Sequence, residues 1–242
     1  MARLIPDDRF AAVVVAAAQV FIAHGYQRTQ VRDVAEVLGL GKGTLYGYAQ
    51  SKAALFAAAV RYGDGHEPLP RPGDLPVPTP GDGEIAALVT ARLAAEIADL
   101  TLAHALASPP VEVDPAAGDA ELASIVIDLY QRMAKHRVAI KLVDRCAPEL
   151  PELGEVWFGA GRHAQVLAVQ EYLTRRHRAG TLTLPGPAGP LARTIVELCA
   201  LWAVHFHFDP APATARVETI DGTAVAAMLA ELIVRATTTS GR

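Results

Sequence analysis

The stretch Thr29–Phe56, TQVRDVAEVLGLGKGTLYGYAQSKAALF, decides the fold of this 242-residue chain. Its first part predicts a short amphipathic helix that Gly39 closes with a tight turn. A second short helix is predicted over Lys42–Ala49, and Ser51 is a good N-cap for another that runs to about Tyr62. The second helix is rich in Lys, Thr and Tyr, which suit phosphates and base edges. This pattern is typical of a helix-turn-helix whose second helix enters the major groove of DNA.

A further helix is predicted upstream of this stretch. Apolar residues from Phe10 to Ile22 recur at three-and-four spacing, and Gly25 is a natural left-handed cap. We therefore predict an N-terminal three-helix helix-turn-helix DNA-binding domain at residues 1–62, closed by the helix after Ser51.

The rest of the chain also has helical patterning. Hydrophobic residues make up 51% of the sequence and charged residues 20%, which indicates a folded protein and argues against global disorder. No run of alternating β-branched residues stands out, so the predicted fold class is all-α. Body helices are predicted at 83–107, 120–136, 138–146, 151–178, 188–208 and 221–237.

A proline-rich segment separates the two parts. Residues 63–81 hold six prolines and four glycines. Each proline lacks a backbone N–H donor and disfavours helix in the residue before it. We predict an extended linker or exposed loop there, with a proline-recognition motif as the alternative. A helical ligand-binding and dimerisation domain is expected at residues 82–242.

Charge is distributed unevenly between these parts. Residues 1–62 carry seven Lys and Arg against four acids, so the formal net charge of −4 leaves −7 on the remainder. A mildly basic head on an acidic body fits DNA engagement by the head, although random scatter of surface charge would look similar.

The last two predicted helices carry apolar stripes that suit an interface. A homodimer through helices 188–208 and 221–237 would bury both stripes in a four-helix contact. The alternative is that both stripes bury within one monomer. The stripe residues are Leu191, Ile195, Leu198, Trp202 and His205, then Val225, Met228, Leu229 and Leu232.

Cysteine usage and the N-terminus indicate an intracellular protein. Cys146 and Cys199 lack metal or redox spacing and read as reduced packing residues. The apolar run Phe10–Ile22 is too short to span a bilayer, and MARLIPDDRF contains no signal-peptide core. We expect a soluble, cytoplasmic protein with no membrane partner and no cofactor.

The opening stretch resembles the TetR/AcrR family of transcriptional regulators, and the match extends over about the first 60 residues. The body resembles that family only in length and helical character. The matching elements are Gly25-Tyr26, Thr29, Val31–Ala35, Leu38–Leu40, Lys42–Tyr46, Tyr48, Ser51-Lys52 and Leu55-Phe56.

The resemblance implies a ligand-responsive DNA-binding regulator. Such proteins are homodimers whose acidic C-terminal domain dimerises and binds a small-molecule inducer. Most are repressors that leave a palindromic double-stranded operator when the ligand binds. The DNA-contacting positions that the resemblance implies are Thr29, Gln30, Arg32, Lys42, Gly43, Thr44, Tyr46, Tyr48 and Lys52.

Each of these contacts has a sensible chemistry, although any one Lys or Arg could instead be a solvated charge. Thr29 and Gln30 would meet phosphate, Arg32 a base edge, and Tyr48 and Lys52 would clamp phosphates. Lys42, Gly43, Thr44 and Tyr46 would lie against the groove.

Four departures from the family pattern affect this site. Gln30 and Gly41 stand where helix caps are usual, so Thr29 must cap or the first helix starts softly. Gly47 replaces a bulky groove-facing residue, and Ala49 replaces a core Phe. With Gly43 and Gly47 outward, we predict a recognition helix that is soft before binding and relies on DNA shape.

Competing functions have weaker support. His205, His207 and Asp209 would point apart on a helix, so a metal site needs an irregular helix end. Arg175–Arg178 reads either as a second nucleic-acid patch or as cations at a helix C-terminus. No nucleophile or phosphate-loop signature appears, so an enzyme is not expected; a helical enzyme or a protein-interaction module with a vestigial head is the alternative.

The inducer pocket is the least defined part of the prediction. A mixed apolar and polar lining is what such a cavity needs, although each candidate could instead be ordinary core. The candidates are Tyr130, Met133, Trp157, Phe158, His163 and Trp202.

Overall fold

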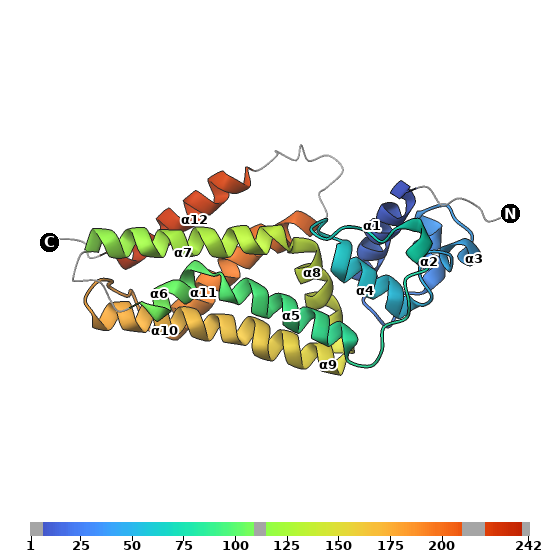
Figure 1. The fold of residues 1–242 in the computed structure, drawn as a ribbon. Coiled ribbons are helices and arrows are strands. Elements are labelled where there is room, and N and C mark those ends of the chain that lie inside the picture. Colours follow the sequence, from blue (N-terminus) through green and yellow to red (C-terminus); the bar gives the residue numbers. More distant parts are fainter. Residues whose placement is uncertain (1–6, 109–114, 210–220, 239–242) are drawn as a thin grey trace. The chain divides into compact units, whose positions relative to one another are not determined.

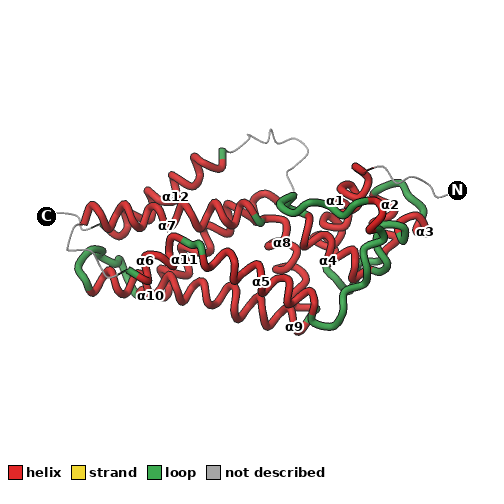
Figure 2. Tube along the Cα trace, viewed as in Figure 1, coloured by secondary structure: helices red, strands yellow, loops and turns green. Residues whose placement is uncertain are grey.

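The computed structural model describes residues 7–108, 115–209 and 221–238. Within these ranges the chain consists of helices and loops, with one isolated β-bridge and no strand (Figure 2). The predicted all-α class is confirmed. The loop expected between the predicted helices 83–107 and 120–136 is shorter than predicted, because residues 115–119 are helical. Residues 109–114 and 210–220, in the expected loops, lie outside the described residues.

The predicted N-terminal helices form at the expected places. They are α1 (Asp7–His24), α2 (Val31–Val37), α3 (Lys42–Leu45) and α4 (Lys52–Tyr62) (Figure 1). Gly25 and Gly39 adopt the predicted left-handed conformation, with φ of 81° and 62°. The Ser51 hydroxyl caps α4 by accepting from the Ala54 N–H at 3.1 Å.

The recognition helix is shorter than predicted. The sequence predicts Lys42–Ala49, but α3 ends at Leu45 and continues as turns through Tyr48. The N–H groups of Gly47 and Tyr48 donate to carbonyls three residues back, at 3.1 and 2.9 Å. Two glycines within six residues lower the helix propensity here, which accounts for the tightening.

The body helices differ from prediction in their interruptions. The predicted helix 83–107 is two helices, because the chain breaks at Asp99–Leu100. The predicted helices 151–178 and 188–208 contain the π-helical segments η3 and η4. The observed elements are η1 (Pro72–Asp74), α5 (Glu84–Ala98), α6 (Thr101–Ala107), α7 (Pro115–Lys135), α8 (Arg137–Cys146), η2 (Ala147–Glu149), α9 (Pro151–Gly154), η3 (Glu155–His163), α10 (Ala164–Arg178), α11 (Ala188–Ala200), η4 (Leu201–His205), η5 (Phe206–Phe208) and α12 (Gly222–Thr237).

The described chain divides into two compact units. Unit 1 comprises residues up to Thr90 together with His136–Trp157, and unit 2 comprises Ala91–Lys135 with the described residues from Phe158 on. Helix α8 packs against α1 and α4 and therefore belongs with the helix-turn-helix. The predicted domain borders at 62 and 82 stay predictions, and the structure adds a later segment to the first unit.

Aromatic packing holds the helices of unit 1 together. The Phe21 ring meets the Phe56 ring edge-on at 5.1 Å between centroids, and Tyr26 stacks on Phe21 at 5.9 Å. Phe21, Leu45 and Phe56 are fully buried. The core of unit 1 thus joins α1, α3 and α4 through side chains that the helical apolar spacing placed inward.

The proline-rich segment is bonded to the helix-turn-helix. The Val77 N–H donates to the Tyr48 carbonyl at 2.9 Å, and the Gln50 N–H donates to the Val77 carbonyl at 3.0 Å. The Thr79 hydroxyl donates to the Ser51 hydroxyl at 2.9 Å. Val77 also pairs with Ala49, the small residue that stands in place of a core Phe. Residues 77–79 therefore brace the turn after α3.

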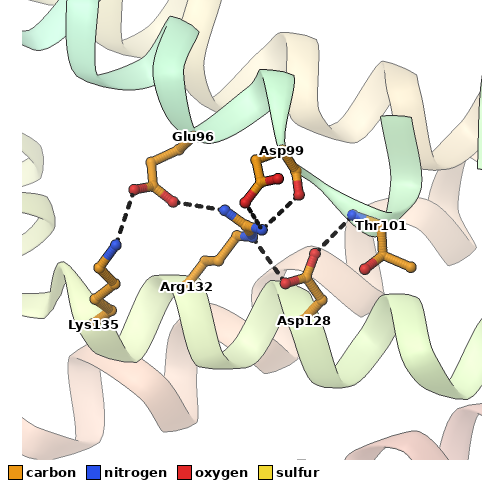
Figure 3. Close-up of polar contacts among 6 residues, drawn as sticks. All are labelled: Glu96, Asp99, Thr101, Asp128, Arg132 and Lys135. Atoms are coloured by element: carbon orange, nitrogen blue, oxygen red, sulfur yellow. Dashed lines mark hydrogen bonds and ion pairs between the residues drawn. The ribbon is translucent and has the colours of Figure 1, made fainter. Parts of the chain in front are cut away.

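In unit 2, a group of ion pairs fixes the break between α5 and α6 (Figure 3). Arg132 of α7 donates to Glu96 at 2.9 Å, to the Asp99 carboxylate at 3.1 Å and to Asp128 at 2.8 Å. The Asp128 carboxylate also accepts the Thr101 N–H at 2.9 Å and so caps the start of α6. Tertiary contacts to α7 thus override the continuous helical pattern at 83–107.

The basic run Arg175–Arg178 at the end of α10 contains one arginine, Arg176, that is buried among partners in unit 2. Arg176 is 2% exposed, donates to both Glu121 oxygens and to the Ala105 carbonyl, and lies beside Tyr172. Burial opposes ionisation of Glu121, but hydrogen bonds from Arg176 and Tyr172 lower the pKa of its carboxyl. Gly180 follows with φ of 77°. These contacts favour the helix C-terminus interpretation over a second nucleic-acid patch.

Candidate nucleic-acid interface

Helix α3 and its turn divide into an exposed face and a buried face. Leu45, Tyr48 and Ala49 are buried, at 0%, 2% and 1% exposure, and they pin the element to the core of unit 1. The exposed residues are Lys42, Gly43, Thr44, Tyr46 and Gly47. The structure therefore brings four of the predicted groove-facing residues together on one surface of unit 1.

The exposed face has no side chain at Gly43 and Gly47, so the backbone is uncovered there. A Cβ at Gly43 would meet no atom within 4 Å, and one at Gly47 would lie 3.2 Å from the Thr44 carbonyl. Tyr46 is the largest exposed apolar side chain on the face, at 41% exposure, and the Lys42 Nζ lies 6.0 Å from its ring centroid. A duplex could approach the backbone closely, with Thr44, Tyr46 and Lys42 supplying the side-chain contacts.

The start of α2 is held differently from the prediction. The Thr29 side chain is 1% exposed, and its hydroxyl donates to the Gly25 carbonyl at 2.6 Å. Thr29 therefore does not cap α2, and its hydroxyl is withdrawn from the predicted phosphate contact. Gln30 is the N-cap residue, and the Asp33 carboxylate accepts the Gln30 N–H at 2.7 Å. The side chain of Asp33 thus stabilises the N-terminus of α2, for which the sequence offers no usual N-cap residue at position 30.

Arg32 and Gln30 remain on the surface at the start of α2. The Arg32 side chain is 64% exposed, with its Nε 3.7 Å from the Asp33 carboxylate. At that exposure the Arg32–Asp33 ion pair contributes little to stability, so the Arg32 guanidinium is available for a base edge or a phosphate.

Tyr48 and Lys52 are both tied into the fold. The Tyr48 residue is buried, so almost none of its surface is left for the predicted phosphate contact. Lys52 Nζ donates to the Tyr26 carbonyl at 3.0 Å and to the Gln27 carbonyl at 3.4 Å, and it sits 4.5 Å from the Tyr26 ring centroid. Its ammonium has three donors, so one remains for a phosphate.

Three functional neighbours were missed by reasoning from sequence. Glu149 and Arg145, on η2 and α8, lie against the turn between α1 and α2. Val77 braces the turn after α3. No local pattern signals contacts across such sequence separations, because they depend on packing alone.

The six predicted pocket residues lie in different surroundings. Tyr130 and Met133 are buried in α7, at 5% and 8% exposure, whereas Phe158 and His163 are exposed on η3. Trp157 belongs to unit 1 and donates its Nε1–H to Asp144 at 3.1 Å, and the others belong to unit 2. Trp202 packs on Phe206 at 5.2 Å between ring centroids. The inducer pocket therefore stays a prediction.

A surface hollow of about 400 Å³ lies along one face of α11 and η4. It is open and shares Leu198 and His205 with the apolar stripe that the sequence predicts as an interface. Its lining residues are Arg193, Thr194, Glu197, Leu198, Leu201 and His205.

The histidine string at the end of α11 lies in irregular helix. His205 ends the π-helical η4, and His207 lies in the 3₁₀ segment η5 with its ring against Phe208. In residues 7–108, 115–209 and 221–238, no three His, Cys, Asp or Glu side chains are grouped as metal ligands.

A helix-turn-helix with an exposed, hydroxyl-rich and basic second helix defines a DNA-binding protein. Two family profiles agree with this class: residues 13–59 match "Bacterial regulatory proteins, tetR family", and residues 121–231 match "AefR-like transcriptional repressor, C-terminal domain". The chain belongs to the TetR family of DNA-binding transcriptional regulators, whose members are not enzymes. Among curated proteins, none matches it significantly.

Solved structures of TetR regulators share the fold over nearly the whole chain. The ketosteroid transcriptional regulator KstR2 of Mycobacterium tuberculosis is similar with a TM-score of 0.58 at 13% identity, covering 98% of each chain. PfmR from Thermus thermophilus gives a TM-score of 0.52 at 18% identity, covering 92% of this chain and 97% of that one. A tetR-family regulatory protein from Rhodococcus RHA1 gives 0.51 at 17%, covering 98% and 100%. At these identities the likeness concerns the fold.

Proposed function

We propose that this protein is a cytoplasmic repressor that binds a palindromic operator as a homodimer and is released by a small apolar molecule. The observation that carries the proposal is the exposed face of α3 in a TetR helix-turn-helix, joined to a C-terminal region matching an AefR-like repressor domain. Repression follows from operator occupancy, which blocks access by polymerase.

The operator contacts divide into phosphate and base contacts. Lys52, Lys42, Gln30 and the start of α2 hold the backbone, while Thr44, Tyr46 and Arg32 meet base edges. The thinness of α3 leaves few direct contacts, so DNA shape carries a larger part of the specificity.

Exposed apolar residues on α11, η4, η5 and α12 support the dimer. Leu201 and Phe206 are 45% and 43% exposed, and Met228 and Leu232 are 49% and 54% exposed. The span Ala188–Phe208 is long and apolar enough to cross a membrane, yet only 33% of its most apolar window is buried. A second copy of the chain, packing the same two helices, would cover this surface.

The test is a salt-dependent footprint on DNA flanking the protein's own gene. A palindromic protected site, bound by a dimer and weakened by rising salt, would support the proposal. A reporter driven from that promoter should fall when the protein is expressed. A monomer in solution with no sequence-preferred footprint would defeat the proposal.

The inducer class is tested separately. Thermal-shift screening of apolar metabolites should find compounds that raise the melting temperature, because a ligand that binds the native state stabilises it. Those compounds should release operator DNA at matching concentrations. Stabilising compounds that leave DNA binding unchanged would contradict release by ligand.

A further inference from the structure

The turn between α1 and α2 is hydrogen-bonded to charged side chains of two other elements, Glu149 of η2 and Lys52 of α4. On one side, the Glu149 carboxylate accepts the Gln27 N–H at 2.5 Å. On the other, Lys52 of α4 donates to the carbonyls of Tyr26 and Gln27 at 3.0 and 3.4 Å. The Gln27 peptide groups are thus tied at both the donor and the acceptor end.

Glu149 is itself held in place as a carboxylate. Arg145, one helical turn earlier, donates to its other oxygen at 3.2 Å. The Gln27 N–H and then Arg145 lower the pKa of Glu149, outweighing the effect of burial. Glu149 is therefore ionised at neutral pH, and its bond to Gln27 is charge-assisted.

Gly25 makes this contact sterically feasible. A Cβ on Gly25 would collide with the Glu149 carboxylate and the Arg145 guanidinium. The glycine thus serves the close approach of η2 as well as its own positive φ of 81°.

The turn determines where α2 begins. Thr29 ties back to the Gly25 carbonyl, and Gln30 starts α2 directly afterwards. Helix α2 is seven residues long and buries only Val34 and Ala35, so its own core contacts constrain it weakly. A shift of the turn would be passed to the α2 N-terminus and to α3, which packs against α2.

We propose that Glu149 is a positioning residue for DNA binding, which holds the α1–α2 turn against Lys52 and thereby sets operator affinity. The carboxylate lies on a segment, His136–Trp157, that continues covalently into α7 at one end and into η3 at the other. A rearrangement of those helices can alter operator affinity through this hydrogen bond, beside the packing of α8 on α1 and α4. The inference rests on the proposed operator binding.

The experiment compares the full-length Glu149→Ala and Glu149→Gln variants with the control Glu155→Gln. Glu155 is an exposed carboxylate six residues later for which the described contacts include no hydrogen bond. Operator affinity, melting temperature, oligomeric state and amide hydrogen exchange at residues 25–33 are measured for each protein.

Glu149→Ala is expected to weaken operator binding roughly tenfold and to speed exchange at residues 25–33, with the oligomeric state unchanged. Glu149→Gln keeps an oxygen that can accept the Gln27 N–H, so its operator affinity should fall less than that of Glu149→Ala. Glu155→Gln should match the wild type. If Glu149→Ala fails to fold, Arg145→Gln, which removes the partner orienting the carboxylate, is expected to give a smaller loss of the same kind.

Unchanged affinity in a folded Glu149→Ala, or a loss explained entirely by the unfolded fraction, would overturn the proposal. If the wild type shows no preferred operator, the repressor function fails instead. Exchange at residues 25–33 then still decides the positioning role, because faster exchange confined to the turn supports it and unchanged exchange refutes it.

Discussion

At the scale of single residues, Lys52 illustrates how a predicted DNA contact also shapes the fold. Its ammonium bonds two carbonyls of the α1–α2 turn and lies over the Tyr26 ring, leaving one donor for a phosphate. Tyr46, by contrast, is exposed at the surface of the turn after α3 and has no comparable tie to the core.

Lys52→Ala is expected to weaken binding to all duplexes by roughly tenfold and to reduce the salt slope by about 1, because it removes a phosphate contact. Tyr46→Ala should also change which sequences are preferred. Affinities for a panel of duplexes at several salt concentrations would separate the two. Identical effects of both substitutions would contradict the assignment of phosphate and base roles.

The two cysteines are buried thiols whose ionisation is suppressed. Burial raises the pKa of Cys199 to about 12, and burial together with the nearby Glu149 carboxylate raises that of Cys146 to about 12. The sequence prediction of inert packing residues agrees with these environments.

Because both pKa values are higher in the folded protein, this contribution to stability is complete below the ordinary thiol pKa of 9.0. It is lost as the pH rises from there towards about 12. We expect the melting temperature to fall over that interval, and a thiol reagent to label the native protein at pH 8 only on unfolding. Cys146→Ala with Cys199→Ala should flatten the alkaline decline; rapid native labelling would contradict this expectation.

At the scale of elements, α3 is kept short and thin by its glycines. Gly43 has open space where a side chain would be, and the turn after Leu45 is braced by Val77 rather than by further α-helix. This arrangement supports the prediction of a recognition helix that is soft before binding.

Gly43→Ala is expected to stabilise α3 by about 1 kcal/mol while weakening operator binding, because the new methyl group occupies the face that approaches DNA. Melting temperature and operator affinity measure the two effects. Gly159→Ala, which also has open space at its Cβ, is the control in η3. Stronger DNA binding by Gly43→Ala would argue against close backbone approach.

Hydrogen exchange without DNA tests the softness of α3 directly. Residues 42–48 should exchange faster than α1, because α3 is only four residues long and Gly43 and Gly47 lower its helix propensity. Protection equal to that of α1 would show that the helix is already rigid.

The break between α5 and α6 is another element whose form depends on partners. Arg132 joins Glu96, Asp99 and Asp128, and Asp128 caps α6 (Figure 3). Such a network depends on each member, because removing one leaves the others with unpaired charge.

Arg132→Met should destabilise the protein by about 2 kcal/mol, since Asp99 and Asp128 lose the cation that Arg132 supplies, while Glu96 keeps Lys135. Denaturant unfolding measures this loss. Arg235→Met, which removes an exposed pair with Glu231, should change stability by less than about 0.5 kcal/mol. Equal losses for the two variants would mean that the network contributes no more than a surface ion pair.

At the scale of the whole molecule, the proposed dimer would cover the exposed apolar surface of α11, η4, η5 and α12. Leu201, Phe206, Met228 and Leu232 leave these helices with uncovered side chains. Two copies packed in this way would have the two-fold symmetry that the proposed palindromic operator calls for.

Leu232→Glu is expected to shift the protein from dimer to monomer and to weaken operator binding, because a buried charge at the interface is unpaired. Light scattering and DNA titration measure both effects. Leu167→Glu on α10 is the matched control, since Leu167 is 48% exposed and lies outside the stripe. Dissociation by Leu167→Glu, or none by Leu232→Glu, would place the interface elsewhere.

Features that depend on neighbouring residues were predicted from the sequence, and features that depend on residues far apart in the chain were not. Gly25, Gly39 and Ser51 act as predicted because caps depend on neighbouring residues. The Asp99–Leu100 break was not predicted, because a hydrogen bond from the distant residue Asp128 helps to decide it. Thr29 and Tyr48 have DNA-binding chemistry in the sequence but are buried in the fold.

The sequence alone determined the all-α class, the helix-turn-helix and the outward placement of Gly43 and Gly47. These follow from helical periodicity, which is a local property of the chain. Only the tertiary structure decided that α8 and η2 join the helix-turn-helix and that Glu149 and Lys52 hold the turn before α2. The physical reason is that a hydrogen bond between Gln27 and Glu149, more than a hundred positions apart, leaves no mark on local sequence, because only the packing of the core brings the partners together.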